Sequence, residues 1–334
     1  MTTTQPAGSP AWLAPQRAAV IYNPIKVDLP TLKRSVDAAS EAAGWDAPLW
    51  LATTARDAGQ AAAGTAIRRG VNLIFAAGGD GTVRAVAEGL RGTGMPLALI
   101  PAGTGNLLAR NLHISVTNLD AAVAAGFTGV DHLIDLGLTR IVRQNGDVEE
   151  HVFVVMAGLG LDAKLISNTN PRLKKAVGWL AYVDAGLRSL PELAPLKLRY
   201  SLNNAPERVV NVHTIIMGNC GELPGGILLM PDAKPDDGVL DIAVFRPRGA
   251  LGWFTIWNRI AWGNGVLRKS AIGRGLINLS TDVKDVTYLT GKDLRLWVDT
   301  PEEFQLDGDQ FGEAVAVHTW LEPHGLTVRV PRPS

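Results

Sequence analysis

Two glycine-rich stretches of this sequence have the clearest capacity for chemistry. The first, GGDGT, covers residues 78–82, and the second, PAGTGNLLAR, begins at Pro101. Glycine allows a backbone to approach a ligand closely, and N–H groups at a helix N-terminus favour an anion such as phosphate. An aspartate in such a loop, here Asp80, indicates a bridging cation, usually Mg²⁺. A tight turn without any ligand is the alternative for the first stretch taken alone.

Each stretch follows a predicted buried strand and precedes a predicted helix. Strand Val71–Ala77 leads into GGDGT and helix Val83–Arg91, and strand Leu97–Ile100 leads into the second stretch. Repeated strand–helix units over about the first 135 residues predict a doubly wound parallel sheet. Its strand-to-helix loops meet at one edge, so both stretches are expected to face one pocket. The other predicted elements here are Ala18–Tyr22, Thr31–Ala43, Pro48–Ala52, Asp57–Arg69 and Asn106–Asn111.

The rest of the chain has mainly strand patterns, which predict an antiparallel β domain. The predicted strands are Val152–Met156, Leu196–Leu202, Arg208–Met217, Leu240–Phe245, Ile277–Leu279, Val286–Leu289, Leu294–Val298 and Ala314–Trp320. Two helical stretches, Pro171–Leu190 and Ala250–Gly263, interrupt them. The domain boundary is expected near Gly137–Arg143.

Composition limits the kinds of protein that the chain can be. It has 334 residues, 46% hydrophobic and 19% charged, which is typical of a globular protein. Lys+Arg and Asp+Glu balance at 32 each, so the net charge gives no reason to expect a nucleic-acid partner. The single cysteine, Cys220, excludes an internal disulfide and suits the cytoplasm. No stretch is apolar over the roughly 20 residues that a bilayer-spanning helix needs.

The motifs, taken in order, resemble a known family. GGDGT and PAGTGN are followed by GLGLDA at 158–163, PDAKPDDGVLD at 231–241 and LDGD at 306–309. This set is similar to that of the diacylglycerol kinase catalytic family of lipid kinases, which includes soluble bacterial diacylglycerol kinases and sphingosine kinases. NAD kinases and phosphofructokinases are more distant relatives.

The resemblance implies an α/β plus β fold with the active site in a cleft between two domains. Residues 1–16 would be a flexible tail. Residues 17–139 would form a nucleotide-binding α/β domain, completed by about 321–334, and residues 140–320 a β-sandwich-like substrate domain.

The resemblance also implies roles for individual residues. Asp309 would be the general base and Asp80 would lie near the Mg²⁺ that accompanies ATP, while Asp307 would orient or ligate nearby. Asp237, with the backbone carbonyls of Lys234 and Val239, matches a structural metal site. Simple turns are the alternatives for 307–309 and for Asp237. The residues expected to bind the nucleotide are Asn23, Lys26, Thr53, Gly78, Gly79, Gly81, Thr82, Thr104 and Asn106.

Several positions depart from the family pattern. Lys26 follows Asn23-Pro24 where the family has Ser-Gly, and it is either a phosphate ligand or a solvated lysine. Thr53 is either a nucleotide contact or a residue near a helix start. Arg84-Ala85 replaces an Asn-Glu pair, so Arg84 either binds phosphate or is a surface residue of its helix. The base is aspartate where the family has glutamate.

The leading hypothesis is an ATP-dependent lipid kinase that phosphorylates diacylglycerol or a related long-chain lipid alcohol. Arg172–Leu190 and Ala250–Arg268 combine apolar spacing with basic or tryptophan residues, which suits peripheral contact with the inner membrane face, although both could simply cover the β domain. The alternatives are a soluble-substrate kinase of the NAD kinase type and a non-catalytic nucleotide or lipid sensor. A homodimer is compatible with the sequence.

Overall fold

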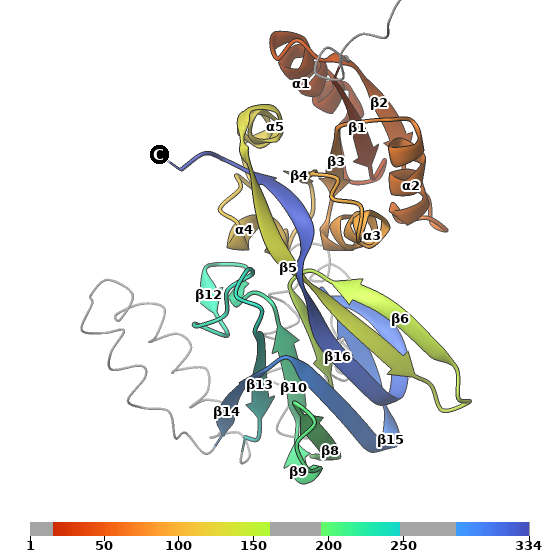
Figure 1. Cartoon of the computed structure of the whole chain (residues 1–334), viewed down its shortest axis with the longest axis vertical. Helices are drawn as coiled ribbons and strands as arrows, with labels where there is room; N and C mark the ends of the chain where they lie inside the picture. The colour runs from red at the N-terminus through yellow and green to blue at the C-terminus, as the bar shows by residue number, and fades with distance from the viewer. Residues whose placement is uncertain (1–15, 161–194, 248–284, 334) are drawn as a thin grey trace, which may run out of the picture.

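The computed structural model describes residues 16–160, 195–247 and 285–333. Residues 1–15 of the predicted tail, both interrupting helices and the predicted strand at 277–279 lie outside these residues, as do residues 161–163 of the GLGLDA motif. Figure 1 shows a part made of both helices and strands above and a β-rich part below.

The N-terminal region is a parallel sheet. Strand β1 (Arg17–Tyr22) lies between β2 (Asp46–Ala52) and β3 (Leu73–Gly78), and β4 (Leu97–Pro101) pairs with the other edge of β3. All of these pairs are parallel. The expected doubly wound parallel sheet is therefore confirmed.

Helices cover both faces of this sheet. Helices α1 (Leu29–Ala42) and α5 (Leu119–Thr128) pack on one face, and α2 (Gln60–Arg68) and α3 (Asp80–Leu90) pack on the other (Figure 1). Strand β3 is buried throughout: alternate residues such as Phe75 face α1 and α5, while the intervening ones face α2 and α3. Burial on both faces explains why a parallel strand reads as a nearly continuous apolar run.

The rest of the described chain is β-rich, as expected. Strand β15 (Asp293–Leu306) and strand β16 (Asp309–Val330) form a long antiparallel hairpin, and the end of β16 pairs in parallel with β4. One sheet thus runs through both regions. The other strands are β5 (Val130–Val142), β6 (Val148–Phe153), β7 (Met156–Leu159), β8 (Leu196–Leu202), β9 (Arg208–Val212), β10 (Thr214–Gly218), β11 (Glu222–Leu223), β12 (Ile227–Leu228), β13 (Leu240–Phe245) and β14 (Val286–Gly291).

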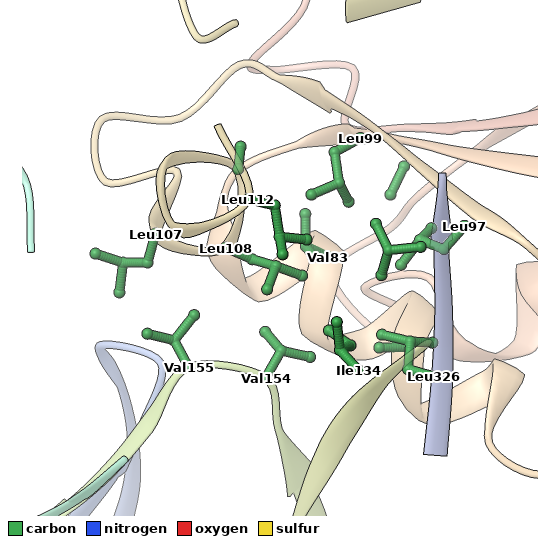
Figure 2. Close-up of a cluster of buried hydrophobic side chains, with 14 of the residues drawn as sticks. Val83, Leu97, Leu99, Leu107, Leu108, Leu112, Ile134, Val154, Val155 and Leu326 are labelled. Carbon is green, nitrogen blue, oxygen red and sulfur yellow. The ribbon is translucent and has the colours of Figure 1, made fainter. Parts of the chain in front are cut away.

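A buried apolar cluster joins the two regions beneath α3 and α4 (Leu107–Asn111). Figure 2 shows Val83 of α3 and Leu108 of α4 above Val154 and Val155, which connect β6 to β7. These side chains are 8% exposed or less. Burying one such side chain stabilises the fold by about 1.5–3 kcal/mol relative to leaving it exposed. The cluster therefore fixes the starts of α3 and α4 relative to the β-rich region.

The two glycine-rich loops touch through their backbones. Gly79 caps the N-terminus of α3, and Gly103 lies in the loop between β4 and α4. A Cβ built on Gly103 would lie only 2.6 Å from the Cα of Gly79. The N–H of Ala102 also donates to the carbonyl of Gly78 at 2.8 Å. The adjacent strands thus bring the predicted loops together, and the contact requires glycine.

We expect Gly103→Ala to separate the loops and to lower the free energy of unfolding by about 2 kcal/mol, because the clash is with backbone that cannot move aside. Chemical denaturation measures this. The matched control is Gly64→Ala in α2, where the nearest contact is the mobile end of Arg68 at 3.3 Å. That change should be neutral or stabilise by up to about 1 kcal/mol. Equal effects of the two substitutions would contradict the importance of the loop contact.

Candidate active site

The carboxyl ends of the parallel strands bring the predicted nucleotide-binding residues to one edge of the sheet. Asn23 follows β1, Thr53 follows β2, and Gly78 ends β3. Thr104 and Asn106 follow β4. Ligands collect at this edge in open α/β sheets.

The residues after β1 and β2 have different surroundings. The Asn23 side chain accepts the N–H of Ile25 at 3.0 Å, which closes the turn after β1. Lys26, in the same turn, is exposed. Thr53 is buried, and its N–H donates to the carbonyl of Tyr22 at 2.9 Å. Lys26 is thus free to reach a ligand at this edge, whereas Asn23 and Thr53 shape the edge itself.

The Asp80 carboxylate links the two glycine-rich loops. One oxygen accepts the N–H of Asn106 at 3.0 Å, and the other accepts the N–H of Leu107 at 2.5 Å. Burial raises the pKa of the Asp80 carboxyl, although these backbone N–H groups lower it, and the charge of Asp309 raises it further. A cation beside Asp80 would therefore be favourable, and each oxygen keeps a lone pair for one.

Asn106 completes the second loop. Its side chain accepts the N–H of Gly103 at 2.9 Å and donates to the carbonyl of the same residue at 2.8 Å. Its backbone is left-handed, with φ 48°, which asparagine tolerates better than most residues. Thr104, inside this closed loop, is exposed toward solvent. Thr82 is buried in the first turn of α3 against Gly78.

On the other side of the site, a tight turn joins β15 to β16. Asp307 and Gly308 both have positive φ, as a two-residue hairpin turn of type I′ requires. The Asp307 carboxylate is buried and accepts the N–H groups of Val154, Val155 and Met156 at 2.8–3.0 Å. Burial raises the pKa of Asp307 to about 6 against the effect of these donors. Asp307 therefore anchors the hairpin to the segment between β6 and β7.

Asp309 faces the first glycine-rich loop. Its side chain is 51% exposed, so a substrate can reach it. A Cβ built on Gly81 would lie 2.5 Å from the Asp309 Oδ2 atom, so this carboxylate lies directly against the first turn of α3. The structure thus brings together GGDGT and Asp309, which are more than 200 residues apart in the sequence.

Arg84 lies between α3 and the hairpin. Its Nη2 atom is 3.2 Å from the Asp309 Oδ2 atom, and its guanidinium lies over the Phe311 ring at 4.5 Å. At 9% exposure it is not a surface residue of the helix, so the structure excludes that one of the two alternatives. Ala85, which replaces the second residue of the family's Asn-Glu pair, is also buried. Burial at a helix–hairpin contact could not be deduced from local sequence.

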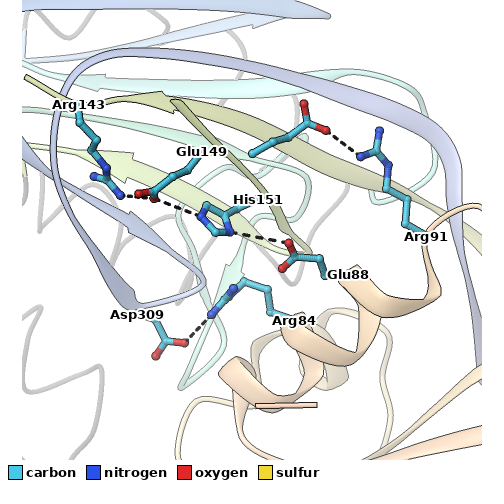
Figure 3. A network of polar contacts seen from close by, with 8 residues as sticks. Arg84, Glu88, Arg91, Arg143, Glu149, His151 and Asp309 are labelled. Atoms are coloured by element: carbon cyan, nitrogen blue, oxygen red, sulfur yellow. Dashed lines mark hydrogen bonds and ion pairs between the residues drawn. The ribbon is translucent and has the colours of Figure 1, made fainter. Parts of the chain in front are cut away.

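A polar network that the sequence did not reveal extends from this contact (Figure 3). His151 on β6 lies 3.8 Å from Glu88 of α3 and 3.4 Å from Glu149, which pairs with Arg143. Hydrogen bonding to Glu88 is the main reason that the pKa of His151 is raised. Nothing in the sequence motifs points to His151, because its main partner, Glu88, comes from α3.

The proposed metal loop lies elsewhere. The Asp237 carboxylate accepts the N–H of Val239 at 3.0 Å, and buried Asp135 of β5 accepts the N–H of Gly238 at 2.6 Å. Burial raises the pKa of Asp241 to about 6, and nearby Asp237 adds to the shift. In the described part of the chain, no group of three or more His, Cys, Asp or Glu side chains is placed to hold a metal. A cation here would need backbone carbonyls such as those expected of Lys234 and Val239.

Comparisons with known proteins agree with this architecture. Residues 17–139 match the diacylglycerol kinase catalytic domain, and residues 154–274 match the YegS C-terminal NAD kinase beta sandwich-like domain. A crystal structure of a diacylglycerol kinase from Bacillus anthracis has a TM-score of 0.71 at 22% identity, covering 94% of this chain and 97% of that one. This structural likeness shows the fold.

The sequence relatives show the family. A probable lipid kinase YegS-like of Pseudomonas fluorescens is 34% identical over 238 residues, covering 70% of this chain and 74% of the relative. A diacylglycerol kinase of Mycobacterium tuberculosis is 36% identical over 179 residues. That match spans 54% of this chain and only 56% of the relative. The chain belongs to the diacylglycerol kinase family, as a YegS-like member with both characteristic domains.

The helical segments expected to contact a membrane lie outside the described residues. Among the helices that the structure does describe, each is too short or too polar to cross a bilayer.

The contact between His151 and Glu88 makes a prediction about pH. Because the folded-state pKa of His151 is raised, its charged form stabilises the fold below the ordinary value of 6.5, and this contribution is lost as pH rises through the folded-state pKa. We expect His151→Gln to lower the melting temperature more at pH 5.5 than at pH 8.5. The corresponding loss in the free energy of unfolding should be about 1 kcal/mol or less. Thermal melts at both values measure it.

The matched control for this prediction is Glu88→Gln, which removes the main cause of the raised pKa. In that background, His151→Gln should show a smaller difference between the two pH values. An unchanged difference would assign the effect to another group.

Proposed function

We propose that this protein is an ATP-dependent lipid kinase that transfers the γ-phosphate to the hydroxyl of diacylglycerol or a related long-chain lipid alcohol. The observation that carries the proposal is the Asp309 carboxylate, exposed to substrate and lying against Gly81 at the start of α3. Phosphoryl transfer depends mainly on positioning and charge neutralisation, with a carboxylate accepting the proton of the attacking hydroxyl.

The nucleotide phosphates fit the N-terminal side of this site. The start of a helix favours an anion through its dipole and its N–H groups. In α3, the N–H groups of Thr82 and Val83 already donate to the carbonyl of Gly79, so the dipole is the main contribution. Lys26 is exposed at the same sheet edge and could add a positive charge. The exposed Thr104 lies in the neighbouring loop. These features support a triphosphate beside the two glycine-rich loops.

A divalent cation also fits the side chains that are present. Mg²⁺ bound with the nucleotide would neutralise phosphate charge during transfer. Asp80, whose pKa is raised by burial and by Asp309, would hold it with its remaining lone pairs. We propose a separate structural cation for Asp237 with the carbonyls of Lys234 and Val239.

The residues of this chain then have two kinds of role, which are accepting a proton and positioning the reacting groups. Asp309 accepts the hydroxyl proton at Oδ1 or Oδ2. The start of α3 holds the phosphate in line, and Asp307 keeps the hairpin in place through Val154, Val155 and Met156. For a lipid acceptor, we propose peripheral contact with the cytoplasmic membrane surface, with no role for nucleic acid.

The direct test is phosphate transfer from ATP to diacylglycerol in mixed micelles with Mg²⁺. We expect Asp309→Asn to reduce kcat by about 10²- to 10⁴-fold, the range for loss of a general base. Asp80→Asn should also reduce kcat, because an amide both weakens the link between the loops and lacks the charge for the cation. The matched control is Asp299→Asn, an exposed residue of β15 that pairs with Lys197 and should leave turnover unchanged.

Two other results would contradict the proposal. Transfer to NAD in the same assay, with none to lipid, would identify a soluble-substrate kinase. Saturable ATP binding without turnover on any lipid alcohol, while wild type and Asp309→Asn behave alike, would identify a sensor.

A further inference from the structure

The Arg84 side chain is buried where α3 meets the β15–β16 hairpin. It follows Asp80 and Gly81 by about one helical turn, so it extends from the same end of the helix. Burying a guanidinium costs free energy unless its charge is paired. Arg84 pairs with Asp309, whose carboxylate lies 3.2 Å away, as Figure 3 shows.

Phe311 fixes the orientation of this guanidinium. Asp309 and Phe311 are two residues apart in β16, so their side chains lie on the same face of the strand. The Arg84 guanidinium lies 4.5 Å from the centroid of the Phe311 ring. The His151 ring packs against the same ring, with centroids 4.8 Å apart and planes at 61°. Arg84 therefore contacts both the base and the aromatic residue next to it on the strand face.

The Asp309 side chain, the proposed base, has few contacts besides the one with Arg84. Half of the Asp309 side chain is exposed, and within the described residues its side-chain hydrogen bond is the one from Arg84. A half-exposed aspartate without such a bond would sample several rotamers. In the observed rotamer, Oδ2 lies against Gly81, where any Cβ would collide with it. Arg84 and Gly81 together thus define where the carboxylate lies.

We infer that Arg84 is a positioning residue, which holds the Asp309 carboxylate over the start of α3 so that the base meets the acceptor hydroxyl beside the phosphate. This inference rests on the proposed kinase function. Among the described residues, the buried Nε atom of Arg84 has no hydrogen-bond partner, so the contacts seen for the guanidinium are those with Asp309 and Phe311. Arg84 acts through Asp309; direct contact with the transferred phosphate is the competing role.

A double-mutant cycle separates these two roles. Arg84→Gln, Asp309→Asn and the double variant are compared with wild type for kcat and for KM toward ATP. We expect Arg84→Gln to lower kcat by about 10- to 100-fold, the cost of a displaced catalytic group, with little change in KM for ATP. In the Asp309→Asn background, Arg84→Gln should cause no further loss.

Two additional variants serve as controls. Arg84→Lys keeps the charge but loses the planar group that stacks on Phe311, so it should recover part of the lost kcat. Arg91→Gln, at the C-cap of the same helix, removes ion pairs to Glu150 and Glu322 and should leave kcat unchanged. Thermal melts of all variants show whether a loss of kcat is a loss of folding.

Several outcomes would overturn the inference. A loss from Arg84→Gln that persists in full in the Asp309→Asn background, with a raised KM for ATP, would assign Arg84 to the phosphate. Full activity of Arg84→Gln would give it no role. A wild-type protein that transfers phosphate to no lipid alcohol would instead contradict the proposed function. A crystal structure of Arg84→Gln adds a readout that is independent of activity. The Asp309 carboxylate is expected to move away from Gly81 in this variant. An unmoved carboxylate would reject the positioning role.

Discussion

The continuity of strand β16 is the constraint on which the rest of the site depends. The strand begins at Asp309 and ends at Val330, and its pairing partner changes from β15 at the start to β4 at the end. The candidate base and the strand beside the second glycine-rich loop are therefore parts of one hydrogen-bonded sheet. Backbone hydrogen bonds, and not a mobile linker, set how the β-rich region lies against the sheet edge that carries the glycine-rich loops. The apolar cluster under α3 and α4 then fixes this arrangement from within.

Three aspartates lie near the glycine-rich loops and the β15–β16 hairpin, and their different surroundings give them different contacts. Asp80 uses its carboxylate to join two loops, and Asp307 uses its carboxylate to anchor a hairpin. Both lie where burial raises the pKa, and both are surrounded by backbone donors. In the described part of the chain, no backbone N–H donates to the Asp309 carboxylate, and this side chain is half exposed, which suits the proposed proton acceptor. Asp80 and Asp307 therefore hold in place the glycine-rich loops and the hairpin turn, and Asp309 lies between these elements.

The sequence predicted the fold and the loops well, because both depend on local pattern. Buried runs such as Val71–Ala77 followed by glycines indicated parallel strands and their loops, and the structure has β3 and GGDGT there. It could not predict the burial of Arg84, since that depends on a hairpin more than 200 residues away. The network around His151 was missed for the same reason: its partner Glu88 lies on another element. Contacts between distant elements carry no short-range signal in one sequence.

Arg84 and Ala85, which follow GGDGT, set the charge where the start of α3 meets the β15–β16 hairpin. Two unit charges of like sign roughly 6 Å apart repel by about 3 kcal/mol at an effective dielectric constant of 20, so a free carboxylate beside the phosphate loops opposes a triphosphate. Arg84 offsets this charge by pairing with Asp309, and its positive charge also opposes part of the rise that burial causes in the pKa of Asp307. Ala85 adds no carboxylate of its own, and it is buried. The pair Arg84-Ala85 thus makes this edge more favourable to the proposed nucleotide than a pair with a carboxylate would, and Arg84 keeps Asp309 beside the start of α3.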